Sequence, residues 1–337
     1  MQYRGDVKSD LIRAYGSDPI AFSTLQPGLS YFETSFGYVA HQPALGFAMA
    51  LGPPICADGD RAEMIERFLR HHRRPVFFYV RRDVADLVMN LGGGGLQMSG
   101  MGVDKVLPLD AWPDDLHPKV RGALKKARRS DLRLVEVRPS ELGVHERERI
   151  DSITQSYLRK RTVQTEMRFI NRPLSFDDDL SRMFVLQLGP EARVFGYVVL
   201  DPYFANGRVQ GYLLNLIRCE PTRLWGVYYS VVAKLVSLLK AEGLEQFSLG
   251  FCPLVDVNVE GCSPWLSRQV QWMERQCADI DYLARLREMK EVFPGVTPQR
   301  YFVTPSRWVA TTVLAFLLAS GVPIRGIIRR LFSVEAQ

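Results

Sequence analysis

The second half of the sequence carries the pattern that most limits how the chain can fold. Three strand-like segments, residues 182–188, 193–200 and 209–218, follow one another, and a long helix is predicted over residues 225–242. A further strand is predicted at residues 247–250. Antiparallel strands followed by a strand–turn–helix–strand unit are typical of α/β domains. We therefore predict an α/β fold with mixed sheets.

The first half alternates short apolar runs with helical patterns. Strands of a meander are predicted at residues 37–41 and 46–51, and the apolar run at residues 75–80 is typical of a buried strand. Between them, Asp60 and Glu63 have the spacing of a capping box, in which each side chain bonds the backbone of the other residue. This spacing predicts a helix that begins at Asp60.

Length and composition predict two globular domains and exclude several other classes. The chain has 337 residues, of which 47% are hydrophobic and 24% are charged, so disordered, collagen-like and coiled-coil chains are excluded. The N-terminus has no apolar core of a signal peptide, and the five cysteines are scattered without a C-x-x-C pair. We expect free thiols, no metal site and a cytoplasmic protein.

A basic helix is predicted over residues 117–130. Its narrow apolar stripe consists of Val120, Leu124 and Ala127. The remaining positions hold six cations and no acid: Lys119, Arg121, Lys125, Lys126, Arg128 and Arg129. The net charge of the chain is only +6, but unbalanced cations on one helix favour an anionic partner. The alternative is an ordinary solvated face.

The C-terminal tail has a different composition. Residues 308–324 contain no charged side chain, and three arginines follow them, Arg325, Arg329 and Arg330. The run is shorter than the about 20 apolar residues that span a bilayer. An interfacial helix with a basic rim is favoured instead. We predict that residues 308–332 contact membrane lipid, so that the protein is peripheral at the cytoplasmic face of the inner membrane. The alternative is a helix packed against the body.

The turn before the long helix has a candidate phosphate-binding sequence. Arg223-Leu224-Trp225-Gly226 is close to the Arg-x-x-Gly-x-Gly/Ala turn of N-acetyltransferase-type (GNAT) folds, although Tyr228 stands where Gly or Ala is expected. Such turns direct backbone N–H groups at an anion. Arg223 and Gly226, together with the basic-helix residues Lys125, Lys126, Arg128 and Arg129, are therefore the predicted residues for binding the donor's phosphates.

Six segments, taken in order, resemble the catalytic domain of the phosphatidylglycerol lysyltransferases, or multiple peptide resistance factors. They are LGPP (51–54), PVFFYV (75–80), PKVRGALKKARR (118–129), LLNLIRCEP (213–221), FSLGFCPL (247–254) and LREMKEVFPGVTPQRYFVTP (286–305). The resemblance implies two tandem GNAT-like lobes, residues 1–138 including the basic helix and residues 139–305, followed by the tail, 306–337. It also implies aminoacyl transfer from aminoacyl-tRNA to a lipid hydroxyl, with no cofactor or metal.

The resemblance also suggests site residues. Lys290 and Arg300 match the basic residues of the family's last segment, and Arg218 matches the arginine of its Asp-Leu-Met-Arg segment. These three cations are candidates for polarising the acyl carbonyl or clamping phosphates, and Asn215 for orienting the acyl group. Asn215 and Tyr229 stand where the family has acids, which disfavours lysine as the transferred amino acid.

Two other functions remain open from the sequence. The GNAT-type turn would also suit an acyltransferase that uses acyl-CoA or acyl carrier protein, and the missing acids would suit a non-catalytic membrane- or RNA-binding protein. The oligomeric state and the identity of donor and acceptor are not indicated by the sequence.

Overall fold

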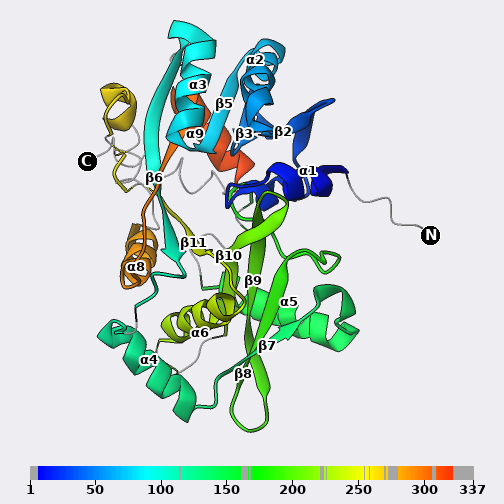
Figure 1. Ribbon diagram of the computed structural model, residues 1–337, viewed down its shortest axis with the longest axis vertical. Coiled ribbons are helices and arrows are strands. Elements are labelled where there is room, and N and C mark those ends of the chain that lie inside the picture. The colour runs from blue at the N-terminus through cyan, green and yellow to red at the C-terminus, as the bar shows by residue number, and fades with distance from the viewer. Residues whose placement is uncertain are drawn as a thin grey trace, which may run out of the picture.

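The computed structural model describes residues 7–113, 115–160, 166, 168–220, 224, 226–253, 255–257, 259–268, 271, 280–305 and 309–321. Within them, one 12-stranded sheet runs through the molecule in the order β1-β2-β3-β5-β12-β6-β11-β10-β9-β8-β7, with β4 paired to β2 (Figure 1). Parallel and antiparallel neighbours both occur in it, so the predicted α/β fold with a mixed sheet is confirmed.

The strands of the first half are β1 (Ser30–Thr34), β2 (Gly37–Ala44), β3 (Phe47–Leu51), β4 (Ile55–Cys56), β5 (Pro75–Val80) and β6 (Leu96–Pro108). Those of the second half are β7 (Arg133–Val137), β8 (Arg182–Leu188), β9 (Arg193–Ala205), β10 (Arg208–Cys219), β11 (Gln246–Pro253) and β12 (Gln299–Pro305). The helices are α1 (Val7–Tyr15), α2 (Arg61–His71), α3 (Arg82–Gly92), α4 (Pro118–Arg129), α5 (Val144–Leu158), α6 (Val227–Ala241), α8 (Ile280–Glu291) and α9 (Val309–Ala319).

The sheet contains two β–α–β units with parallel strands. In the first, α2 connects β3 to β5, and in the second, α6 connects β10 to β11. The last strand of each half, β6 or β12, pairs with strands of the other half. Strand β6 is antiparallel to β11, and β12 lies between β5 and β6. The predicted boundary at residue 138 stays a prediction, but the halves share one sheet.

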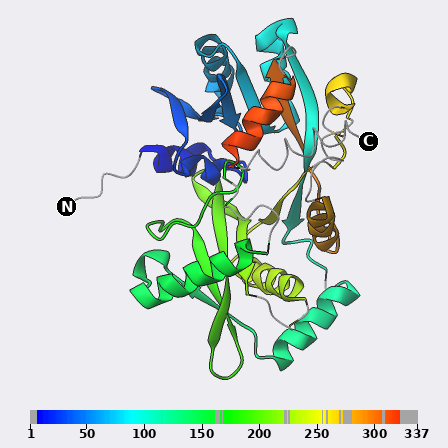
Figure 2. The ribbon, with the colours of Figure 1, turned by 180° about the vertical axis from the view of Figure 1, so that it is seen from behind.

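Helices cover both faces of the sheet. On the face seen in Figure 1, α3 and α6 pack on apolar side chains such as Phe77 of β5 and Phe247 of β11. On the face seen in Figure 2, α9 packs on Phe78 and Phe302, and α5 packs on Tyr197 and Val199. Each strand of the centre is therefore buried on both sides.

Some local predictions are corrected by the structure. The prediction of a capping box at Asp60 and Glu63 is wrong. Helix α2 begins at Arg61, but Asp60 has helical backbone angles because it is the last residue of a 3-10 turn. Its side chain makes no capping hydrogen bond. Helix α5 and strands β1 and β7 were not predicted, because few of their residues are buried; α5 buries only Ile150, Ile153 and Leu158.

The described part of the tail lies against the body, as the alternative for this segment expected. Ala315 of α9 is fully buried, Phe316 stacks on Phe78 with ring centroids 4.7 Å apart, and Thr312 hydrogen-bonds Thr304 of β12. The rest of the tail, 306–308 and 322–337, lies outside the described residues, and no helix in the described part of the chain could span a bilayer. Contact with membrane lipid stays a prediction.

Candidate active site

The two β–α–β units differ at one corresponding position. Tyr79 is the fifth residue of β5 and Gly250 the fifth of β11, and the first residues of both strands pair with the preceding parallel strand. Both have left-handed backbone angles, with φ of 63° at Tyr79 and 78° at Gly250. A tyrosine in this conformation is strained, whereas glycine adopts it freely. The first unit therefore has a large side chain where the second has none.

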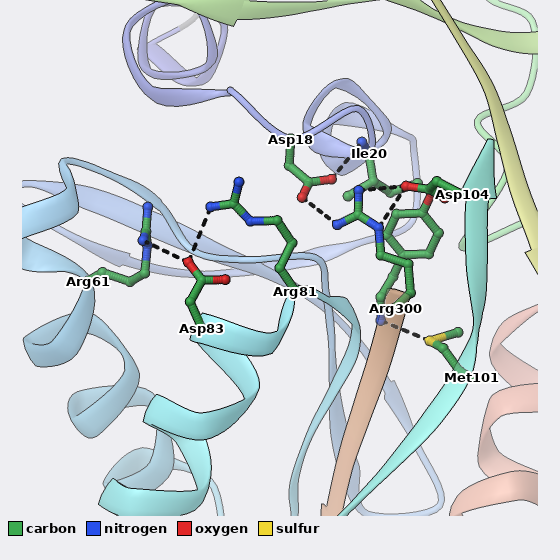
Figure 3. Close-up of polar contacts among 9 residues, drawn as sticks. Asp18, Ile20, Arg61, Arg81, Asp83, Met101, Asp104 and Arg300 are labelled. Atoms are coloured by element: carbon green, nitrogen blue, oxygen red, sulfur yellow. Dashed lines mark hydrogen bonds and ion pairs between the residues drawn. The ribbon is translucent and has the colours of Figure 1, made fainter. Parts of the chain in front are cut away.

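In the first unit, Tyr79 contacts a buried charge network. Figure 3 shows the centre of this network, with Arg300 between Asp18 and Asp104. Arg300 of β12 is 2% exposed; its Nη1 lies 2.6 Å from Asp18 Oδ2, and its Nε lies 2.7 Å from Asp104 Oδ2. The guanidinium also stacks 4.7 Å over the Tyr79 ring, and the Tyr79 hydroxyl donates to Asp104. Two carboxylates and one ring thus surround Arg300.

The electrostatics of this network favour a structural role. Burial alone would lower the pKa of Arg300, but Asp104 and Asp18 outweigh it and raise that pKa well above its usual range. Burial raises the pKa of the Asp104 carboxyl, against the opposing effect of Arg300. The predicted site residue Arg300 has its hydrogen bonds directed at protein groups, and it ties β12 to β6 and to the segment before the 3-10 helix Ala21–Leu25.

In the second unit, two paired strands part at the corresponding place. Strands β10 and β11 pair only over Gly211–Leu213 and Gln246–Ser248; beyond this point β10 pairs with β9 alone, and β11 with β6. Lys290 of α8 lies where the two strands part, because a Cβ placed on Gly250 would be 3.2 Å from a Leu213 methyl and 3.9 Å from Lys290 Nζ.

The ammonium group of Lys290 has an unusual setting. It is 5% exposed, and Nζ donates a 2.8 Å hydrogen bond to the Phe251 carbonyl. Burial lowers the pKa of Lys290, although Cys252 and Asp104 oppose this effect. A buried ammonium with a lowered pKa is a strong hydrogen-bond and proton donor. Of the predicted cations, Lys290 is the one placed at the parting strands.

Arg218 of β10 lies on the α5 face of the sheet. Its guanidinium forms a two-pronged ion pair with Glu166, Nη2–Oε2 2.6 Å, and stacks 5.5 Å over the Tyr157 ring. The arginine side chain is 7% exposed and Glu166 is 28% exposed. Glu166 was not predicted from sequence, since it is one acid within a basic stretch.

Asn215 is also held by protein groups. Its Nδ2 donates to the Arg172 carbonyl at 2.9 Å, and the Arg172 guanidinium is bound by Asp201 at 2.6 Å and Asp178 at 2.8 Å. An aspartate at position 215 would lack this N–H donor and would face the Asp201 carboxyl. The pKa of Asp201 is already raised by burial. This explains why an amide replaces the expected acid here. Tyr229 occupies the second position at which an acid was expected, and its ring packs near Phe293.

Of the predicted phosphate-binding residues, Gly226 contacts helix α4. It has φ of 79° and caps α6, and a Cβ on it would be 2.7 Å from the Cβ of Ala123 in α4. Arg223 lies outside the described residues. The predicted cations of α4, Lys125, Lys126, Arg128 and Arg129, are all exposed. Within the described chain, Lys125, Arg128 and Arg129 form no ion pair. No metal-binding cluster occurs among the described residues.

Comparisons with known proteins show the family and the fold of the chain. The family model described as phosphatidylglycerol lysyltransferase, C-terminal, matches residues 9–304. The C-terminal domain of a protein named as a lysylphosphatidylglycerol synthetase from Agrobacterium fabrum superposes with a TM-score of 0.77 at 15% identity, covering 94% of this chain and 96% of that one. L-PGS from Bacillus licheniformis gives 0.76 at 14% identity, covering 94% and 97%.

A curated relative is an uncharacterized protein of Corynebacterium glutamicum. It is 22% identical over 253 residues, which make up 72% of this chain and 32% of the relative. The chain thus spans about a third of the length of this relative. At these identities the superpositions establish the fold alone: a mixed α/β fold with one large sheet, shared with these two proteins.

Proposed function

Since the chain belongs to the family of phosphatidylglycerol lysyltransferase C-terminal domains, we propose that it is an aminoacyltransferase. In this proposal it moves an aminoacyl group from aminoacyl-tRNA to a hydroxyl group of a membrane lipid or small amphiphile. The observation that carries the proposal is the buried Lys290 ammonium where β10 and β11 part, in the unit that has glycine in place of Tyr79.

The chemistry requires a donor for the developing oxyanion. The acceptor hydroxyl attacks the aminoacyl ester carbonyl, the bond from the carbonyl carbon to the ribose oxygen breaks, and the hydroxyl proton ends on the ribose oxygen. Negative charge gathers on the carbonyl oxygen in the transition state, where a fixed, buried donor stabilises it. Lys290 supplies such a donor, since burial lowers its pKa and its backbone partner fixes Nζ.

The two substrates have separate supports in the chain. The exposed cations of α4 suit the phosphates of tRNA, because each neutralised phosphate releases counterions. The apolar and basic tail suits a lipid acceptor. We further propose an uncharged aminoacyl side chain, since the carboxylates expected at Asn215 and Tyr229 are absent and nearby Asp201 is neutralised by Arg172.

The direct test incubates the protein with charged tRNAs and vesicles containing phosphatidylglycerol, and then looks for labelled aminoacyl-lipid. We expect product from the native protein and a loss of about 10²–10³-fold in kcat for Lys290→Met, the effect of removing one oxyanion donor. Lys234→Met is the matched control at saturating tRNA, since Lys234 is a half-buried lysine that, like Lys290, bonds a backbone carbonyl, that of Leu132. Absence of product with every amino acid would refute the proposal.

An acyl-thioester donor is the second candidate. It is favoured by Gly226, whose left-handed backbone caps the start of α6 without a side-chain hydrogen bond. A backbone of this kind can hold a pyrophosphate. Saturable turnover of acyl-CoA or acyl carrier protein, with no response to charged tRNA, would select this alternative.

A further inference from the structure

Helix α9 has an apolar side that faces away from the protein. Thr312 and Ala315 are buried against the sheet, whereas Leu314 and Leu317 are partly exposed and Leu318 is 42% exposed. The three leucines stand at i, i+3 and i+4, so they share one side of the helix. The helix contains no charged residue, and a surface helix without a polar outer face is typical of a second apolar contact.

The chemistry around this face indicates its partner. In the sequence, α9 is followed by Gly321 and then by Arg325, Arg329 and Arg330. The exposed Arg168 lies at the C-terminal end of the helix, where its backbone N–H donates to the Ser320 carbonyl at 3.1 Å. Apolar side chains on an uncharged helix, with an exposed arginine at its end, match an anionic lipid surface. A protein partner would find no hydrogen-bonding groups on the three leucines.

This face also lies on the same side of the sheet as a predicted site residue. Figure 2 shows α9 and α5 on one face, and Arg218 stacks on Tyr157 of α5. Its partner Glu166 adjoins the end of α9, because a Cβ on Gly321 would be 3.4 Å from the Glu166 carbonyl oxygen. Helix α4, with its exposed cations, packs near α6 on the opposite face (Figure 1).

We propose that Leu314, Leu317 and Leu318 of the docked α9 form the surface that rests on an anionic bilayer. The protein then lies with the α9–α5 face toward the lipid and α4 toward the aqueous side. This orientation brings the Arg218–Glu166 pair to the lipid side and leaves α4 open to a polyanion. The inference deepens the lipid-acceptor part of the proposed function, and its test needs no catalysis.

The test is vesicle binding by co-sedimentation. Leu314→Glu/Leu318→Glu should weaken binding to vesicles of phosphatidylcholine and phosphatidylglycerol by about tenfold or more, since it places two charges at an apolar interface. Leu238→Glu is the matched control: Leu238 is a leucine on α6, 36% exposed, on the other face of the sheet, and its variant should bind like the native protein. Vesicles of phosphatidylcholine alone should bind all three proteins weakly.

Equal binding by the double variant and the native protein would overturn the proposal, because the tail beyond Gly321 would then suffice. A second measurement covers the case in which the double variant folds poorly. An environment-sensitive fluorophore on Leu318→Cys should shift to the blue with anionic vesicles, and one on Leu238→Cys should not, with the unsubstituted protein as the labelling blank. Equal responses at both positions would also contradict the inference. Failure of the transferase assay would leave these readouts intact.

Discussion

Replacing Arg300 tests whether its buried ion pairs hold the two halves of the sheet together. Arg300→Met leaves Asp18 and Asp104 without their cation in a place where the exposed fractions are 3% and 0%. Breaking a buried ion pair costs about 3–5 kcal/mol, and loss of the stacking on Tyr79 adds about 0.5–1 kcal/mol. We expect the free energy of unfolding to fall by about 4 kcal/mol.

The pH dependence gives the prediction a distinctive sign. Burial raises the pKa of the Asp104 carboxyl, and without Arg300 nothing of opposite charge counters this effect, so the deficit is fully present at neutral pH. It shrinks as the pH falls toward the unfolded value of about 4, because this carboxyl becomes protonated and neutral. Urea unfolding followed by circular dichroism at pH 7.5 and pH 5 measures both effects.

Two further variants test the same structural role of Arg300. Arg300→Lys keeps a cation but loses the fork that reaches both Asp18 and Asp104, so we expect an intermediate loss of about 2 kcal/mol. Adding Asp104→Asn to Arg300→Met should recover part of the stability, because one buried charge is removed. If Arg300→Met unfolds like the native protein and yet abolishes aminoacyl transfer, the structural role is refuted and the catalytic role expected from sequence is restored.

Three other predictions concern α4, the start of α6 and a histidine cluster. Changing three exposed α4 cations to glutamine should lower the salt dependence of tRNA binding by about three phosphate contacts; these cations are Lys125, Arg128 and Arg129. The same change at three exposed arginines in and near α2 is the control and should leave the salt dependence unchanged; these arginines are Arg67, Arg70 and Arg73. Gly226→Ala should destabilise the fold by about 2 kcal/mol in thermal unfolding, because of its positive φ and the contact with Ala123; an unchanged Tm would contradict the docking of α4. Burial and the neighbouring His41 and His71 lower the pKa of His72 to about 4, so the unfolded state takes up the proton first and stability falls as the pH drops from about 6.5 to 4. We expect about 1 kcal/mol between pH 7 and 5, allowing for partial exposure, and His72→Phe should flatten this slope.

Local patterns predicted the elements that bury much apolar surface. The second β–α–β unit was predicted because β10 and α6 are rich in apolar residues, and α6 alone buries eight residues. Helix α5 escaped prediction because its exposed face is long and polar. The placement of β12 between β5 and β6 has no local signal, since it depends on pairing between segments far apart in the chain.

Only part of the candidate site could be predicted from the sequence, because the site also depends on contacts between segments far apart in the chain. Similarity to the family indicated Arg218, Lys290 and Arg300 together as site residues. Only the structure shows that the three side chains have different surroundings. Asp18 is 282 residues from Arg300, and Glu166 is 52 residues from Arg218, so no spacing in the sequence foretells either pair. The Lys290 setting depends on the parting of β10 and β11 at Gly250, a tertiary feature. The roles assigned to these residues stay predictions until variants are measured.

The most direct test of the central claim is a crystal structure with a non-hydrolysable aminoacyl-adenosine analogue, in which an amide replaces the ester. The account predicts that the analogue's carbonyl oxygen lies between β10 and β11, about 3 Å from Lys290 Nζ. It also predicts that the Arg300 network with Asp18 and Asp104 stays as it is. An analogue bound at Arg300, or elsewhere with Lys290 still bonded only to the Phe251 carbonyl, would contradict the assignment of the site to the second unit.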